Sequence, residues 1–101
     1  MRLGRVAGKV VLGVATPELV GVTLLIVEPM SHEDLIAEAV HGSGKALVVA
    51  DQLSPSQGQL IAFVEGPEAA NPYRPNNVPV DAYCSLVVDN LVYQPLAAEE
   101  K

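Results

Sequence analysis

The sequence predicts a mainly β protein, a small five-stranded, OB-like closed barrel with one or two short helices. Short runs of Val, Ile, Leu and other strand-forming residues are separated by clusters of Gly, Pro, Asn and Asp, as in strands joined by turns. Only one stretch has apolar residues at helical spacing. A length of 101 residues fits a single domain, and closure is how a small antiparallel sheet removes its edges.

Five segments predict the strands of the barrel. The first segment alternates, so that Arg5 and Lys9 fall on one face and Val6 falls on the other, in a row with Gly4 and Gly8. Glycine inside a strand marks a sharp bend or a close approach of two backbones. The predicted strands cover residues 2–14, 19–28, 45–51, 59–65 and 82–93.

A change of hydrophobic period after the second strand predicts a helix over residues 31–41. Ser31 and Asp34 resemble a capping box, and Gly42 suits the position just past the helix. His32 and His41 lie about half a turn out of phase on such a helix, so they do not form a metal-binding pair. We expect both histidines at the surface.

The balance of apolar and charged residues predicts an oligomer. Apolar residues make up 50% of the chain and charged residues 18%, which leaves apolar surface that a domain of this size covers by association. No apolar stretch reaches the ~20 residues of a membrane-spanning helix, and no leader peptide is evident. We expect a cytosolic protein with one barrel domain over residues 1–93 and a polar tail over residues 94–101.

Recognisable patterns for catalysis or cofactor binding are missing from the sequence. It contains no phosphate-binding loop, dinucleotide fingerprint or zinc-ligand spacing, so we expect no cofactor and no metal. Cys84 lies in an apolar strand without a neighbour that would activate its thiol. A small hydrolase that uses Cys84 or a serine is therefore a minor alternative.

An OB-like barrel also allows a ligand-binding module for nucleic acid or carbohydrate, which is the main alternative function. Such modules combine aromatic stacking platforms with a basic groove. The chain has six basic residues against twelve acidic ones, a net charge of −6, three Tyr, one Phe and no Trp. This composition disfavours binding that depends on neutralising phosphates.

Several short motifs, taken in order, resemble one protein family. They are Gly4-x-Val6-x-Gly8-x-Val10-Val11, Gly21-Val22-Thr23-Leu24-Leu25-Ile26-Val27, Val48-Val49-Ala50-Asp51, Gly66 with Ala69, and Pro79-Val80-Asp81-Ala82 followed by Val87-Val88-Asp89. In this order and spacing they resemble the EutN/CcmL family of bacterial microcompartment vertex proteins. The chain departs from the family pattern in three places. The departures are Ser54-Pro55-Ser56 for a glycine-rich loop, Gly66-Pro67-Glu68-Ala69-Ala70 for Gly-Ser-Ser-Ala-Arg, and a longer segment between the second and third strands.

The resemblance implies a structural protein that catalyses nothing. Five copies would form a homopentamer, with a homohexamer as the less favoured ring. The pentamer would cap the five-fold vertices of a polyhedral microcompartment shell in the cytoplasm, beside hexameric and trimeric shell proteins. No nucleic acid and no membrane is implied as a partner.

Three groups of residues are candidates for contacts within such a shell. The predicted subunit interface comprises Gly66, Pro79, Val80, Asp81 and Ala82. The predicted loop near the ring axis comprises Ser54, Pro55, Ser56, Gln57 and Gly58. The basic residues Arg2, Arg5 and Lys9 precede any acidic residue and are candidates for docking to other shell proteins.

Overall fold

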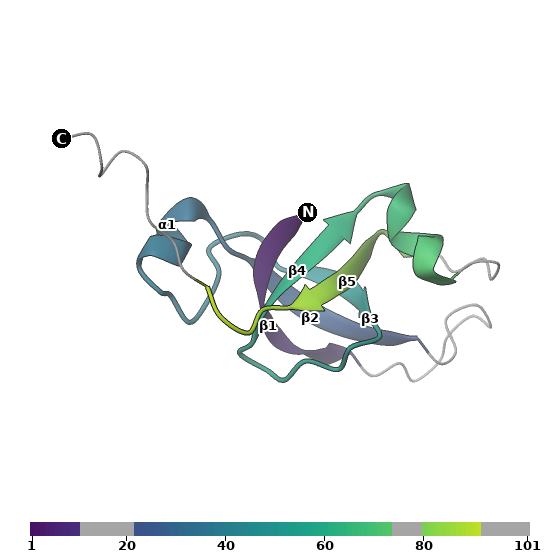
Figure 1. Cartoon of the computed structure of the whole chain (residues 1–101), viewed down its shortest axis with the longest axis horizontal. Coiled ribbons are helices and arrows are strands. Elements are labelled where there is room, and N and C mark those ends of the chain that lie inside the picture. The colour runs from purple at the N-terminus through teal and green to yellow at the C-terminus, as the bar shows by residue number, and fades with distance from the viewer. Residues whose placement is uncertain (11–21, 74–79, 92–101) are drawn as a thin grey trace.

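In the computed structural model of the chain, five strands close into one small barrel (Figure 1). The structure describes residues 1–10, 22–73 and 80–91. The strands are β1 (Arg2–Val10), β2 (Thr23–Pro29), β3 (Leu47–Asp51), β4 (Leu60–Glu65) and β5 (Ala82–Val87). Around the barrel they follow the order β1-β2-β3-β5-β4. The predicted mainly β class and the five-stranded closed barrel are confirmed.

The strand pairing is antiparallel at every contact except one. β3 and β5 run parallel and meet where Ala50 lies opposite Tyr83. The register shifts between Val6 and Gly8 in the pairing of β1 with β2, and again after Ala62 in the pairing of β4 with β5. Such bulges increase local twist and bend, which lets short strands close into a barrel.

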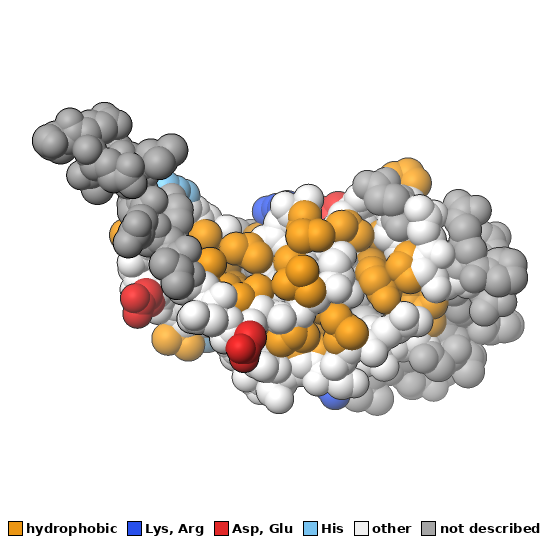
Figure 2. Space-filling view, in the orientation of Figure 1, with side chains coloured by type: hydrophobic (Ala, Val, Ile, Leu, Met, Phe, Trp, Pro, Cys, Tyr) orange, Lys and Arg blue, Asp and Glu red, His pale blue; other side chains and the backbone are white. Residues whose placement is uncertain are grey.

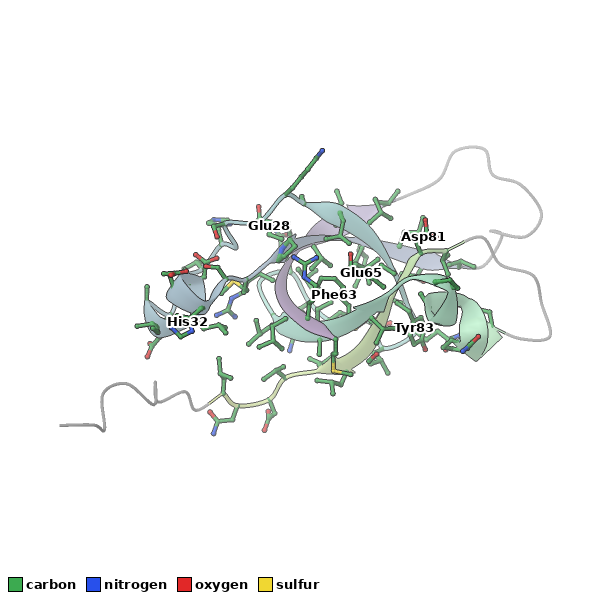
Figure 3. The ribbon with its side chains drawn as sticks, turned by 90° about the horizontal axis from the view of Figure 1, so that it is seen from above. Glu28, His32, Phe63, Glu65, Asp81 and Tyr83 are labelled. Carbon is green, nitrogen blue, oxygen red and sulfur yellow. The ribbon has the colours of Figure 1, made fainter. Side chains whose placement is uncertain are left out.

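Apolar side chains fill the inside of the barrel. Leu25 and Val27 are fully buried, whereas Ile26 between them is 37% exposed, as the alternation of a strand requires. Phe63 is the largest fully buried side chain and lies at the middle of the barrel (Figure 3). The buried cluster comprises Val6, Leu25, Val27, Val49, Ile61, Phe63, Ala82 and Cys84.

Each predicted strand overlaps an observed strand, and the differences fall at the ends. β3 begins at Leu47, two residues after the predicted start, and β5 ends at Val87, before the predicted end at residue 93. Past β5, the Val88 amide donates to the Leu60 carbonyl at 2.9 Å. Parts of the predicted strands, and the predicted tail over residues 94–101, lie outside the described residues.

The helix after β2 is shorter than predicted. α1 spans only His32–Ile36, and its capping box is as predicted, with the Ser31 hydroxyl accepting from the Asp34 amide. The helix ends because Glu38 adopts a left-handed backbone with φ of 54°. The Glu38 amide donates to the Leu35 carbonyl, and the Ala39 amide donates to the Asp34 carbonyl, which together make a Schellman motif.

The predicted role of Gly42 as the residue that ends the helix is therefore wrong. Gly42 lies against the backbone carbonyls of Glu28 and Pro29, where a Cβ atom would overlap their oxygens. Gly42 is needed because its segment approaches the backbone at the end of β2 closely. At the end of the helix, Glu38 takes the position that glycine usually occupies.

A second short helix occupies part of the polar stretch after β4. It is a 3-10 helix, η2, over Pro67–Tyr73. α1 and η2 lie at opposite ends of the barrel (Figure 1). In the described part of the chain, the barrel therefore has one small helix beside each end.

Candidate functional site

The two arginines of the N-terminal strand contact other parts of the chain. Arg2 Nη1 donates to Glu65 Oε1 at 3.0 Å, in an ion pair that is about half exposed on both sides. The Arg2 guanidinium also lies 5.7 Å from the centre of the Phe63 ring. Arg5 donates to two backbone carbonyls, those of Ala39 at 3.3 Å and Gly58 at 3.2 Å. Arg5 thus ties the α1 segment and the loop before β4 to β1.

Lys9 is the third basic residue of β1 and is exposed. It makes no ion pair or hydrogen bond within the described part of the chain. The role of Arg2, Arg5 and Lys9 in docking to other shell proteins stays a prediction.

The loop predicted near the ring axis begins at a buried carboxylate. Asp51, the last residue of β3, is 2% exposed. Its carboxylate accepts from the Leu53 amide at 3.0 Å and from the Ser54 amide at 2.7 Å. This is the way in which aspartate stabilises a tight turn, and it holds Ser54 at a left-handed φ of 57°.

The same loop is fixed at its far end by β1. The Gly58 amide donates to the Val6 carbonyl at 2.7 Å, and the Ser56 amide donates to Gln59 Oε1 at 2.6 Å. As a result Ser54–Gln57 face Gly8 and Lys9 across a pocket of about 440 Å³. Two groups that the sequence kept separate, the predicted axial loop and the last basic residue of β1, meet at this pocket.

The predicted interface turn lies where β4 ends and β5 begins. The Gly66 amide donates to the Asp81 carbonyl at 2.8 Å, and Gly66 has a φ of 93° that favours glycine. Ala82 is buried in the core, whereas the side chain of Asp81 is exposed at the η2 end of the barrel (Figure 3). Pro79 lies outside the described residues.

The only cysteine of the chain has an unreactive environment. Cys84 is fully buried, and its thiol donates weakly to the Leu86 carbonyl at 3.7 Å. Burial, followed by the nearby Asp51 carboxylate, raises the pKa of the Cys84 thiol to about 12. A nucleophilic cysteine needs the opposite shift, so the geometry argues against the hydrolase alternative.

The described aromatic residues do not form a stacking platform. Phe63 is fully buried, and Tyr73 and Tyr83 pack edge to face on each other with ring centres 5.6 Å apart. The Tyr83 hydroxyl donates to Gln52 Oε1 at 2.8 Å. The Tyr73 hydroxyl is buried and has no hydrogen-bond partner among the described residues, and burial raises the pKa of Tyr73 to about 12.

A tight hydrogen-bond network closes the segment around α1. Asp34 Oδ2 accepts from the Ser31 amide at 2.9 Å, from the Ser43 amide at 2.8 Å and from the Ser43 hydroxyl at 2.7 Å. These donors hold the pKa of the Asp34 carboxyl well below its usual value. Nearby, Glu28 Oε1 lies 3.2 Å from His41 Nδ1 and accepts from the Gly42 amide.

Two sides of the barrel carry exposed apolar side chains. Ile26 and Val48 are cross-strand partners of β2 and β3 and are 37% and 52% exposed. Leu86 of β5 and Leu91 beyond it are 42% and 41% exposed. Figure 2 shows hydrophobic side chains gathered on the side of the barrel where β5 faces the viewer. We call these the β2–β3 face and the β5 face.

The described ranges contain no candidate metal site and no candidate membrane-spanning helix. No three His, Cys, Asp or Glu side chains within residues 1–10, 22–73 and 80–91 are grouped so that they could hold a metal ion. None of the helices in these ranges has the length and apolar character needed to cross a membrane.

The family model described as "Ethanolamine utilisation protein EutN/carboxysome" matches residues 1–89 of the chain. The chain belongs to the EutN/CcmL family. The match spans the whole barrel, from β1 to the residues just past β5. No curated protein sequence matches this EutN/CcmL family member.

Solved structures of the EutN/CcmL family have the same fold. CcmL of Gloeobacter violaceus is 25% identical with a TM-score of 0.78, and the match covers 92% of this chain and 90% of that one. EutN of Escherichia coli is 26% identical with a TM-score of 0.74, over 92% of this chain and 89% of that one. GrpN of Rhodospirillum rubrum, a pentameric microcompartment shell protein, is 24% identical with a TM-score of 0.75, over 93% and 100% of the two chains.

Proposed function

We propose that this EutN/CcmL family member is a structural shell protein of a bacterial microcompartment, that it forms a homopentamer, and that it caps the five-fold vertices of the polyhedral shell. The family match over residues 1–89 carries the proposal. A flat sheet of six-fold tiles closes into a polyhedron only when five-fold corners are inserted. The chain is proposed to fill these corners beside hexameric and trimeric shell proteins and to catalyse nothing.

The two apolar faces support a ring. In a closed ring, each subunit uses one face to contact a different face of the next subunit. The β2–β3 face is formed by β2 and β3, the β5 face is formed by β5 and the residues beyond it, and each face exposes two aliphatic side chains. We propose that the β2–β3 face of one subunit packs on the β5 face of the next.

Gly66 follows β4, and it meets Val80, Asp81 and Ala82 at the start of β5, where we propose that these residues extend the β5 face. The Asp81 carboxylate is exposed there and is proposed to accept a hydrogen bond from the neighbouring subunit. Asp81→Ala should weaken assembly by roughly 1 kcal/mol, as expected for the loss of one hydrogen bond. Pro79 precedes Val80 in the sequence and is part of the same proposed interface.

Light scattering and native mass spectrometry test the ring directly. Five chains of 10.6 kDa give a 53 kDa particle. Val48→Glu and Leu86→Glu should each yield smaller species, because a buried, unpaired carboxylate opposes assembly. Val40→Glu is the matched control, since Val40 is 71% exposed near α1 and belongs to neither face. Wild-type chains that stay monomeric at micromolar concentration would end the proposal.

Mixing the two interface variants tests whether the β2–β3 face of one subunit contacts the β5 face of the next. A Val48→Glu chain keeps its β5 face, and a Leu86→Glu chain keeps its β2–β3 face, so one contact can form between them. The mixture should give a complex of two chains, 21 kDa from two subunits of 10.6 kDa, and nothing larger. Recovery of full rings from the mixture would show that the faces do not pair in this way.

Shell closure is the test of the function itself. Each subunit carries a net charge of −6, so a pentamer carries five times that, −30, and free rings repel one another at low salt. Docking must therefore come from local contacts, for which Arg2, Arg5 and Lys9 are the proposed basic residues. Hexameric shell proteins co-expressed with the chain should form closed polyhedra, and without it open tubes or sheets. Equally closed shells in its absence, with no other vertex protein present, would refute the vertex role.

A further inference from the structure

The pocket between β1 and the loop after β3 has features of a ligand site that the shell role does not require. Its volume is about 440 Å³, and its lining includes Gly8, Lys9 and the loop residues 54–57. At the Gly8 position a Cβ atom would meet no other atom within 4 Å. The bulge in β1 beside Gly8 and the bend of the loop thus leave space that no side chain of the described residues fills.

Four residues that line this space have polar side chains that can donate hydrogen bonds. The lining residues include Lys9, Ser54, Ser56 and Gln57, whose side chains carry an ammonium group, two hydroxyls and an amide. None of these side chains has an ion pair or hydrogen bond within the described part of the chain. Among the described residues, no Asp or Glu lines the pocket, although the chain as a whole carries −6. The pocket is therefore a locally basic site in an acidic protein.

The loop that supplies three of these donors is fixed before any ligand arrives. Asp51 holds the Ser54 amide at 2.7 Å, Gln59 holds the Ser56 amide at 2.6 Å, and Pro55 is buried. Arg5 donates to the carbonyl of Gly58 at the end of the loop. Because the loop is already ordered, a ligand loses less of its binding free energy to ordering of the protein.

We propose that this pocket binds a small organic anion through its carboxylate or phosphate oxygens. Lysine supplies a compact positive charge, and the hydroxyl and amide groups donate to the same oxygens, as in many oxyanion sites. A cation would be repelled by the charge of Lys9, and none of the described acidic residues lines the pocket to offset this repulsion. All the donors come from one chain, so the inference goes beyond the shell role and does not depend on the ring.

The proposal is tested by titrating the full chain with inorganic phosphate and, separately, with acetate. Sodium chloride at the same ionic strength is the reference, and the amide NMR shifts of Lys9 and of residues 54–58 are followed. We expect saturable shifts at these amides with at least one of the two anions. Saturation with phosphate alone or with acetate alone identifies which kind of oxyanion the pocket prefers.

Two variants with the same change of charge assign the site. Lys9→Gln should weaken binding about tenfold to a hundredfold, the effect of losing one hydrogen bond to a charged group. Lys45→Gln removes an exposed lysine that does not line the pocket, and it should change the affinity less than twofold. Shifts that do not saturate, that chloride reproduces, or that both variants reduce equally would overturn the proposal. Light scattering on the same samples reports the oligomeric state separately, so a failure of the ring and a failure of the pocket are distinguishable.

Discussion

Gly4 and Gly8 lie on the same strand and in the same motif, yet the structure predicts opposite effects when each is changed to alanine. A Cβ at Gly4 would lie 2.5 Å from Val27 Cγ1 and 3.1 Å from Phe63 Cε1. Val27 and Phe63 are fully buried, so neither can move into open space. A Cβ at Gly8 would meet nothing within 4 Å.

The expected changes in the free energy of unfolding follow from these two environments. Overpacking a filled core costs about 1–3 kcal/mol, so Gly4→Ala should lower the free energy of unfolding by about 2 kcal/mol. Where the backbone tolerates alanine, the change stabilises by about 0.4–1 kcal/mol, because the unfolded chain has less freedom to lose. Gly8→Ala should therefore be neutral or stabilising. The two variants should differ by about 2–3 kcal/mol.

Urea unfolding followed by circular dichroism measures this difference, with the protomer concentration held constant because assembly shifts the midpoint. For a domain of about 100 residues, each kcal/mol should also move the melting temperature by about 4–8 °C. Equal midpoints for the two variants would refute the reasoning. A larger loss for Gly8→Ala than for Gly4→Ala would show that a neighbouring subunit covers Gly8.

Three further predictions concern single residues. Glu38 has a left-handed φ of 54°, which glycine adopts without strain. Glu38→Gly should therefore raise the free energy of unfolding by about 0.5–1 kcal/mol in a thermal or urea melt. A destabilised variant would contradict this. Asp51→Ala should lower the free energy of unfolding by about 3 kcal/mol in the same melt, because two backbone amides lose a charged acceptor. Asp89 is exposed, so Asp89→Ala, the control, should change the free energy of unfolding little. Hydrogen bonds from Ser31 and Ser43 lower the pKa of Asp34 below its usual 3.8. The stabilisation that the ionised Asp34 carboxylate gives the folded state is therefore complete above pH 3.8 and declines as the pH falls further. The difference in free energy of unfolding between wild type and Asp34→Asn should therefore be constant from neutral pH to about pH 5 and shrink in more acidic solution; a difference that stays constant down to pH 2 would contradict this.

The strands could be predicted because their signal is local. Alternation and β-branched composition locate the inward residues, and Leu25, Val27, Val49 and Phe63 are all fully buried. The capping box of Ser31 and Asp34 is a pattern of near neighbours and was predicted for the same reason. The length of α1 was not predicted correctly, because Glu38 adopts a backbone conformation that glutamate does not favour.

The candidate site could be predicted only in part, because its contacts join distant parts of the chain. The sequence identified Arg2, Arg5 and Lys9 as one basic group. The structure separates them, since Arg2 pairs with Glu65, sixty-three residues away, and Lys9 faces the loop after β3. Such partners depend on the strand order, in which β5 lies between β3 and β4. Propensity and periodicity carry no information on that order.

The segment between β2 and β3 has a consequence for protein engineering. The pairing of Val27 with Leu47 joins β2 and β3 at the base of this segment, and the Asp34 hydrogen bonds connect Ser31 with Ser43 across it. Each doubling of loop length adds only about 0.6 kcal/mol to the entropy of closure, and Val40 is 71% exposed. A foreign peptide inserted after Val40 should leave the strand register unchanged. In a five-membered ring, such grafts would stand at equal height and equal distance from the axis, which makes this segment a platform for symmetric display.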